Sequence, residues 1–259
     1  MNARMNLAGV AVATQGEVLD SSREYVLRQV ARFARRVPEG LESMRVRLAV
    51  FHRRNLPWSA LVQTNLEVDG HPVRAQVAGA FFTEAGRLLR SRLSEQIARL
   101  RNPDVGRTWP PPGGPRSIPA AGSTDPRRIV RTKSYELKHC SPDQAALFMD
   151  VMDYDFHLFV DADTGQDSVI YRVGPTGYRL ARLSGVTPAT PTRVPLTINV
   201  YPVPWLTPTQ AVARLDDTEM AFQFFGDGQS GRGAVLYRRF DGQYGLITAE
   251  GEAEGEDSE

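Results

Sequence analysis

Two rows of arginines at helical spacing are the residues of this sequence best suited to bind another molecule. The first row lies opposite the apolar stripe of a predicted helix and comprises Arg28, Arg32, Arg35 and Arg36. The second row lies on a later predicted helix and comprises Arg87, Arg90 and Arg101, with Arg92 and Arg99 flanking them. A guanidinium matches a phosphate with two parallel hydrogen bonds, so the rows favour sequence-independent contact with a nucleic-acid backbone. A charged helix face that is simply solvated is the alternative for either row alone.

A basic loop between two predicted strands adds to this positive charge. It contains Arg53 and Arg54, followed by Trp58, whose ring is suited to stacking on a nucleotide base. Packing of Trp58 over the end of the sheet is the alternative. We therefore predict Arg53 and Arg54 as further nucleic-acid contacts.

Charge is distributed unevenly along the 259 residues, although the net charge is only +1. Residues 1–107 carry 17 arginines and 10 acidic residues, a net charge of +7, whereas residues 108–249 have 14 basic and 14 acidic residues. Residues 250–259 contain six acids and no base. The basic N-terminal part indicates a polyanionic partner, and the acidic tail, which has little to bury, is predicted to be disordered.

The N-terminal residues 1–107 are predicted to form one domain with the order β-α-β-β-β-α. The expected strands cover residues 7–14, 44–51, 60–68 and 73–80, and the expected helices begin at a Ser21–Glu24 capping box and at Phe82. Asp69-Gly70 predicts a tight hairpin. The fold class is therefore α+β, with two helices on one face of a small sheet.

A proline- and glycine-rich segment separates this domain from the rest of the chain. Residues 109–126 contain six prolines and three glycines, which neither a helix nor a central strand accommodates. We therefore predict a linker over residues 108–127.

The sequence contains no apolar run long enough to cross a membrane. The chain is expected to be cytoplasmic.

The C-terminal half is an internal duplication. Residues 141–183 align without a gap over residues 207–249, with 13 of 43 positions identical. Each copy is predicted as a leading strand (129–137 or 196–203), a short helix and three strands, which gives repeat 1 at 128–186 and repeat 2 at 187–249. Such a unit buries too little surface alone, so the copies are expected to pair. The residues predicted to pair them are Phe156, Phe159, Tyr171, Tyr178, Phe222, Phe225, Tyr237 and Tyr244.

Two motifs typical of catalysis or metal binding occur in the first copy but not at the equivalent positions of the second. Asp163-Thr164-Gly165 resembles part of an aspartic protease, and the acids at 161, 163 and 167 approach the spacing of a calcium loop. The second copy keeps neither pattern, which favours a turn. The four histidines have no metal-ligand spacing, and Cys140 has no predicted general base. We predict no enzymatic activity, no metal and no cofactor.

The repeats resemble the C-terminal domain of long-form ribosome hibernation promoting factors. The resemblance is carried by IVRTKSYEL at 129–137, SPDQA at 141–145, FHLF at 156–159, VIYR at 169–172 and YRRFDGQYGLI at 237–247. The N-terminal order is similar to the ribosome-binding domain of that family. The duplication is similar to the actinobacterial branch associated with dormancy and hypoxia.

This resemblance implies a role in ribosome hibernation under stress. It implies that the N-terminal domain binds 16S rRNA at the decoding centre and blocks mRNA and tRNA, with the helix arginines in contact. The sequence GAFFTE at 79–84 replaces the family motif at the start of the second helix. Contacts with 23S rRNA and with ribosomal proteins at the subunit interface stay open, as do contacts by Lys133, Arg238 and Arg239.

The duplication suggests how this chain departs from the ordinary long form. There, one C-terminal domain pairs with that of a second molecule and joins two ribosomes. Two copies in one chain could pair internally, so we hypothesise a factor that inactivates single 70S ribosomes. Ribosome dimerisation through intermolecular pairing is one alternative, and an RNA-binding stress regulator acting away from the ribosome is another.

Overall fold

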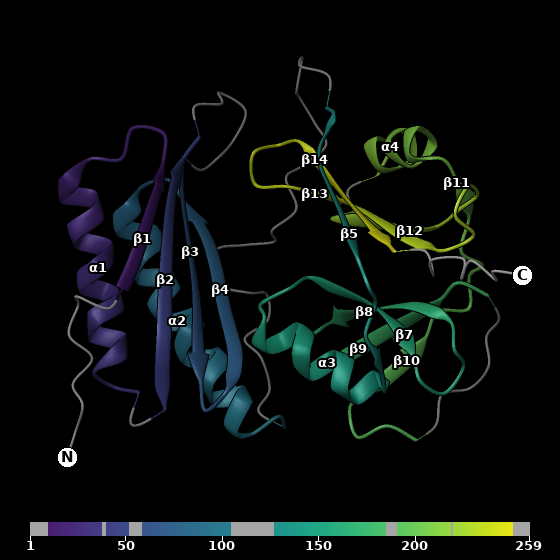
Figure 1. Cartoon of the computed structure of the whole chain (residues 1–259), viewed down its shortest axis with the longest axis horizontal. Coiled ribbons are helices and arrows are strands. Elements are labelled where there is room, and N and C mark those ends of the chain that lie inside the picture. The colour runs from purple at the N-terminus through teal and green to yellow at the C-terminus, as the bar shows by residue number, and fades with distance from the viewer. Residues whose placement is uncertain are drawn as a thin grey trace, which may run out of the picture. The chain divides into compact units, whose positions relative to one another are not determined.

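The computed structural model describes residues 10–37, 40–51, 59–104, 127–184, 191–218 and 220–250 (Figure 1). These residues form two compact units. The first contains residues 10–104 together with 147–155 and 174–176, and the second contains the other described residues from 127 onward. Of the predicted linker the structure describes only residue 127, and of the predicted acidic tail only residue 250.

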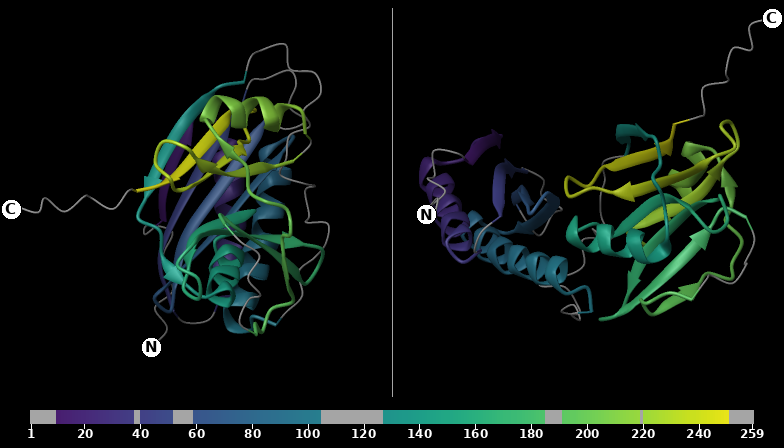
Figure 2. Two further views of the ribbon diagram at one scale, coloured as in Figure 1. Left: turned by 90° about the vertical axis from the view of Figure 1, so that its right-hand side faces the viewer. Right: turned by 60° about the horizontal axis from the view of Figure 1, so that its bottom comes forward.

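The N-terminal part of the first unit has the predicted order of elements. These are β1 (Val10–Gln15), α1 (Asp20–Ala34), β2 (Leu41–Val50), β3 (Ala60–Val68), β4 (His71–Gly79) and α2 (Phe82–Arg101). The strands form one sheet in the order β1-β2-β3-β4, in which only the β1–β2 pair is parallel. Both helices cover the same face of this sheet (Figure 2), which confirms the predicted α+β arrangement.

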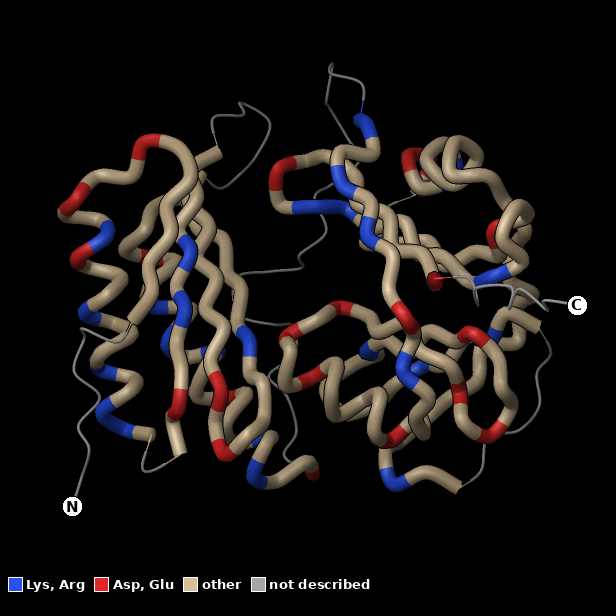
Figure 3. The backbone as a smooth tube through the Cα atoms, in the orientation of Figure 1, with Lys and Arg blue, Asp and Glu red and all other residues tan. Residues whose placement is uncertain are grey.

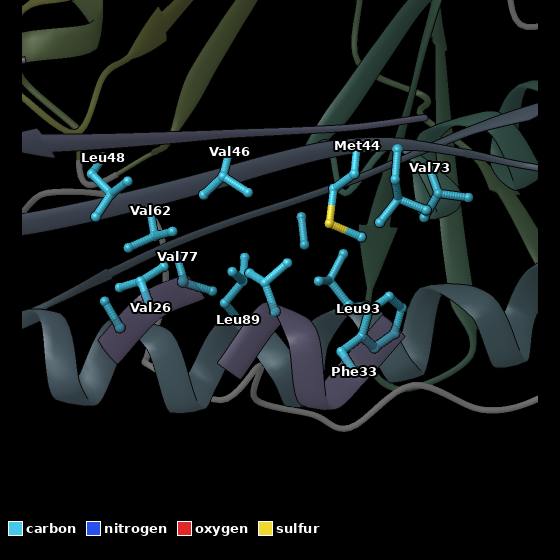
Figure 4. Packing of buried hydrophobic residues seen from close by; sticks show 14 of the residues in the cluster. Val26, Phe33, Met44, Val46, Leu48, Val62, Val73, Val77, Leu89 and Leu93 are labelled. Atoms are coloured by element: carbon cyan, nitrogen blue, oxygen red, sulfur yellow. The ribbon is translucent and has the colours of Figure 1, made fainter. Parts of the chain in front are cut away.

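Alternation along β2 builds one wall of the N-terminal core. Met44, Val46 and Leu48 point toward the helices and are at most 2% exposed. Helix α1 contributes Val26 and Phe33 to the same cluster (Figure 4). Leu89 and Leu93 of α2 complete it, because their spacing places them on one helical stripe. Apolar burial therefore fixes which faces of α1 and α2 point outward.

Of the two local features predicted for the N-terminal part, the hairpin turn is confirmed and the helix cap is wrong. Asp69 and Gly70 both have positive φ, 51° and 72°, as the predicted hairpin turn requires. The predicted capping box at Ser21 was wrong, because α1 begins two residues earlier, with Leu19 as its N-cap and no side-chain cap. Asp20 in the first turn supplies a negative charge near the helix N-terminus instead.

The repeats supply two five-stranded sheets. Repeat 1 contains β5 (Ile129–Tyr135), β6 (His139–Cys140), α3 (Pro142–Val151), β7 (Phe156–Asp161), β8 (Asp167–Val173) and β9 (Gly177–Arg182). Repeat 2 contains β10 (Leu196–Ile198), β11 (Trp205–Leu206), α4 (Pro208–Asp216), β12 (Phe222–Asp227), β13 (Gly233–Arg238) and β14 (Tyr244–Ala249). The two-residue strands β6 and β11 were not predicted, because two residues are too few to show alternation.

Both repeat helices begin in the same way. Thr207 accepts a hydrogen bond from the Gln210 backbone N–H, and the Gln210 side chain accepts one from the Thr207 N–H. Ser141 and Gln144 make the same reciprocal pair in repeat 1. Each of these predicted short helices therefore begins with a capping box, followed by a proline in the first turn.

The leading strand of each repeat pairs with the sheet of the other repeat. Strand β5 lies parallel to β14, and β10 lies parallel to β9, which gives the sheet orders β11-β12-β13-β14-β5 and β10-β9-β8-β7-β6. The registers match: Arg131 lies opposite Gly245, and Thr197 lies opposite Arg179 at the equivalent positions. The predicted elements occur in the predicted order, with β6 or β11 added before the helix, but the leading strand of each copy completes the sheet of its partner copy.

Among the described histidines, His157 is the one whose pKa is displaced from its ordinary value. Burial in β7 and the positive charge of Lys138 lower the pKa of His157 to about 4. Its ring stacks on that of Phe159, with centroids 5.9 Å apart. The folded state therefore holds this imidazole neutral.

We expect this histidine to make folding stability pH-dependent. The unfolded chain binds a proton here below pH 6.5 and the folded chain does not, so the stabilisation present above that pH is lost as pH falls toward 4. From about pH 7 to about pH 5, this group should lower the free energy of unfolding by about 2 kcal/mol. Urea unfolding at both values checks this.

The variant His157→Gln, which has the residue found at the equivalent position 223, should lose this pH-dependent component. His139→Gln is the matched control, because the side chain of His139 is exposed. Equal pH dependence in the wild type and in His157→Gln would contradict the assignment.

Within the described residues, no helix is long and apolar enough to cross a membrane.

Candidate nucleic-acid interface

The two predicted arginine rows lie on neighbouring helices. A Cβ atom at Gly86 of α2 would lie 3.3 Å from Cε1 of Tyr25 and 3.5 Å from Cγ of Gln29, both on α1. Glycine thus allows the two helices to approach closely. Because both helices pack on the same sheet face, their outer faces form one layer, and Figure 3 shows basic residues along α1 in this layer. We call this layer the helix face.

The α1 row is fully on the helix face. Arg28, Arg32, Arg35 and Arg36 are all exposed. Arg28 lies 3.6 Å from Glu24, but the two side chains are 59% and 70% exposed, so their pairing contributes at most about 1 kcal/mol. The other three guanidiniums have no ion pair with any residue that the structure describes. Three unpaired, solvated arginines on one face suit a polyanion.

The α2 row is split between the helix face and a buried stripe. Arg87 and Arg101 are exposed and Arg90 is half-buried. Arg92 and Arg99 are only 7% and 5% exposed, so they do not lie on the outer face expected for them. Together with Gln96 they recur at i, i+4 and i+7, which places them on a stripe of their own.

The buried stripe has an acidic partner within the first unit. Arg92 Nη1 lies 3.4 Å from Oδ1 of Asp153, and Gln96 Nε2 donates to the same oxygen at 3.0 Å. The backbone N–H of Gln76 donates to Oδ2 at 2.9 Å. Arg92 is engaged with a buried carboxylate and Arg99 is itself buried, so neither guanidinium is available to a nucleic acid in this conformation, and we place both outside the candidate interface.

Arg53 and Arg54, together with Trp58, lie outside the described residues. Their role as further contacts stays a prediction.

A second basic surface lies on the sheet face opposite the helices, and sequence analysis missed it. Arg45 and Arg47 alternate with the core residues of β2 and are exposed. Arg45 lies opposite Asn65, which lies opposite Arg74, and Arg47 lies opposite Gln63. The signal was present in the alternation of MRVRLAVF, where both arginines fall on the side away from the core.

The polar side chains at the centre of this sheet face are those of arginines, asparagine and glutamines. Arg47 donates to the side-chain oxygen of Gln15 on β1 at 2.5 Å. The guanidinium of Arg74 lies over the ring of Tyr154, 5.1 Å from its centroid, and donates to the Gln76 side chain. Arg45 has no ion pair among the described residues. The N-terminal sheet therefore presents basic groups on the face that the helices leave open.

The basic residues considered in the repeats are held by local contacts. Arg238 is 8% exposed and donates to the backbone carbonyls of Thr218 and Met220, so it supports the chain after α4 and is not a surface contact. Burial lowers the pKa of this guanidinium, which its neighbours Tyr244 and Asp216 partly offset. Arg239 pairs with Asp241 at 2.7 Å, which raises the pKa of Arg239. Lys133 lies 5.2 Å from the ring centroid of Tyr135.

Four of the eight aromatic residues predicted to pair the repeats make ring contacts between them. The centroids of Phe156 and Phe222 are 4.6 Å apart, those of Phe156 and Tyr237 5.9 Å, and those of Tyr171 and Phe222 5.4 Å. These distances are typical of tilted and edge-to-face aromatic pairs.

The other four lie on the opposite faces of their strands. Phe225 and Tyr244 belong to the core that packs against α4. Phe159 and Tyr178 are the equivalent residues of repeat 1 and are buried as well. Residues an odd number of positions apart on a strand point to opposite faces, which separates Phe225 from Phe222. We correct the predicted pairing set to Phe156, Tyr171, Phe222 and Tyr237.

The acidic residues that suggested catalysis or calcium binding have structural partners. Asp161 pairs with Arg182 at 2.8 Å, and both side chains are fully buried. Gly165 has φ 67° and its N–H donates to the Asp161 carbonyl, as a turn requires. Among the residues that the structure describes, no group of three or more His, Cys, Asp or Glu could hold a metal ion. Burial raises the pKa of the Cys140 thiol, which disfavours the reactive thiolate.

Comparison with known proteins agrees with the duplication and covers nearly the whole chain. The family described as Sigma 54 modulation/S30EA ribosomal protein C terminus matches twice, over residues 124–180 and 198–246. A Mycobacterium tuberculosis protein named dormancy associated translation inhibitor is 40% identical over 254 residues, which cover 94% of this chain and 89% of that protein. The chain belongs to the long-form ribosome hibernation promoting factor family. It falls in the actinobacterial, dormancy-associated branch with a duplicated C-terminal domain.

A more distant relative is shorter. The ribosome hibernation promotion factor of Deinococcus radiodurans is 30% identical over 170 residues, which cover 60% of this chain and 88% of that protein. Family membership thus confirms the resemblance noted in the sequence, while the individual contacts of the helix face stay predictions.

The helix face gives a direct prediction for RNA binding. The triple variant Arg32→Gln, Arg35→Gln and Arg36→Gln removes three exposed charges and leaves the α1 core stripe intact. If these side chains contact phosphates, the slope of log affinity against log salt should become shallower by about 2. Binding of the full chain to small ribosomal subunits across a salt series measures this.

The matched control replaces three exposed arginines of the second unit, Arg131, Arg193 and Arg214, by glutamine. An equal change of slope in both triple variants would show that the effect follows from net charge alone and would contradict an interface on α1.

Proposed function

We propose that this chain is a ribosome hibernation factor that binds the small subunit near the decoding centre through its arginine-rich N-terminal domain. Bound there, the domain blocks mRNA and tRNA and stabilises inactive 70S ribosomes during stress and dormancy. The observation that carries the proposal is the helix face, with exposed arginines of two packed helices and few carboxylates to neutralise them. The names of the relatives, translation inhibitor and hibernation promotion factor, support it.

The chemistry of the helix face suits occupation of an RNA-lined channel. Arginine forks donate to phosphate oxygens irrespective of base sequence, so the domain can bind a fixed ribosomal site without reading bases. A rigid domain with arginines on more than one side can contact rRNA on several walls at once. Arg45 and Arg47 on the open sheet face provide the second side, opposite Arg32 and Arg36. Occupying the channel is then sufficient for inhibition, and no catalytic step is needed.

The C-terminal repeats are proposed to pair within the chain. The ring contacts of Phe156 with Phe222 and Tyr237, and a shared apolar cluster that includes Leu158 and Phe224, support this. So does the reciprocal pairing of β5 and β10. A partner tethered in the same chain is present at a much higher effective concentration than one on a second molecule. We therefore propose that the factor acts on single 70S ribosomes and leaves them as monosomes.

Sucrose gradients of ribosomes, with and without the full chain, test this function. We expect the protein to comigrate with 70S monosomes without a new dimer peak, and a larger share of the α1 triple variant than of the wild type to stay at the top of the gradient. A peak of ribosome dimers would keep ribosome hibernation but contradict intrachain pairing. Wild-type protein that stays at the top would contradict ribosome binding and favour an RNA-binding regulator acting elsewhere.

A further inference from the structure

Contacts between the two repeats come in equivalent pairs, as two-fold symmetry between them requires. Adding 66 to a residue number in repeat 1 gives its equivalent in repeat 2. The contact between Phe156 and Tyr237 thus has its equivalent in the contact between Tyr171 and Phe222. Phe156 and Phe222 are equivalent to each other and touch directly, so they lie where the symmetry axis passes.

A second pair of equivalent residues also touches, but its members differ. Asp167 of β8 and Gly233 of β13 are 66 positions apart, and the Gly233 N–H donates to Oδ2 of Asp167 at 2.7 Å. A Cβ atom at Gly233 would lie 2.8 Å from the Cβ of Asp167. Gly233 does not have the positive φ that favours glycine, so what this position requires is space, first for the aspartate and then for the ring of Phe224, whose Cε2 would lie 3.0 Å from the added atom.

The neighbouring pair of equivalent positions differs in a complementary way. Repeat 2 has Arg232, whose Nε and Nη2 donate to Oδ2 and Oδ1 of Asp167 at 2.8 and 3.0 Å. Repeat 1 has Gln166 at the equivalent position. The Asp167 side chain is 5% exposed, and the Arg232 side chain paired with it is 27% exposed. We call Asp167, Arg232 and Gly233 the axial site.

Pairing of like repeats would place identical residues at this site. Two copies of repeat 1 would bring two Asp167 side chains together, with overlapping Cβ atoms and two buried carboxylates lacking a guanidinium. Two copies of repeat 2 would bring Gly233 against Gly233, which leaves a void, and place two arginines there without a carboxylate. Only a mixed pair has complementary shape and charge.

We propose that the axial site makes repeat 1 bind repeat 2 and reject a second repeat 1. This inference rests on the pairing part of the proposed function and not on ribosome binding. Its consequence is that chains on two neighbouring ribosomes cannot join through like repeats. Each repeat already has its one acceptable partner in the same chain. The surface on repeat 1 is thus specific for a partner carrying arginine and glycine at positions equivalent to 232 and 233.

Moving the axial residues between repeats tests this in the full chain. The variant Gly233→Asp should weaken pairing by a factor on the order of a hundred, because it adds a Cβ and a second buried carboxylate. Amide hydrogen exchange in β5 and β10 reports pairing, since each strand is bonded to the other repeat. The exchange variant Q166R/D167G/R232Q/G233D carries the same Gly233→Asp change but restores a mixed pair. We expect it to recover protection of both strands.

Gly228→Asp is the matched control, because it adds the same side chain to repeat 2 where nothing lies within 4 Å. Loss of protection in Gly228→Asp equal to that in Gly233→Asp would overturn the proposal, and so would an exchange variant that is not rescued. Unchanged protection in Gly233→Asp would overturn it as well. All these measurements use free protein, so a failure of ribosome binding in the gradients is recognised separately.

Discussion

Burial of both faces of the repeat sheets is the constraint on which the C-terminal half depends. The first four residues of β8 and of β13 are all buried, so each strand needs cover on both of its faces. In repeat 2 one face packs on α4, where Phe225 and Leu215 meet. The other face contributes Val235 and Phe224 to a cluster with Leu158 and Val169 of repeat 1. A single repeat offers only one helix, so a second sheet must cover the remaining face.

The reciprocal leading strands follow from the same need. Strand β5 closes the edge of the repeat 2 sheet, and β10 closes the edge of the repeat 1 sheet. Because each repeat completes its partner, separating them would expose apolar surface and also two strand edges. Duplication places both halves of this arrangement in one chain and frees the residues at the axis to differ. Asp167 and Gly233 could not diverge in this way in a symmetric homodimer, where one residue type must face itself.

In the N-terminal domain, helical periodicity and strand alternation place the core residues on one side of each element and the basic residues on the other. The stripe of Val26, Val30 and Phe33 holds α1 against the sheet and leaves Arg28, Arg32 and Arg36 in solvent. On β2 the core residues Met44 and Val46 similarly direct Arg45 to the other face. The charges can therefore be changed without altering the core, which is why variants of the helix face are informative about binding.

Most of the local elements and the duplication were predictable from the order of residues alone. The bounds of β3 and the start of α2 were predicted to the residue, and the Asp69-Gly70 turn was identified, because periodicity and turn chemistry act over a few neighbouring residues. Tertiary structure decided which sheet β5 joins, since any open strand edge offers the same backbone donors and acceptors. It also decided that Arg92 is buried against Asp153, 61 residues away, while Arg90 is not. The complementarity of Asp167 and Gly233 was likewise invisible in the alignment of the copies, because only their contact in space gives the difference a meaning.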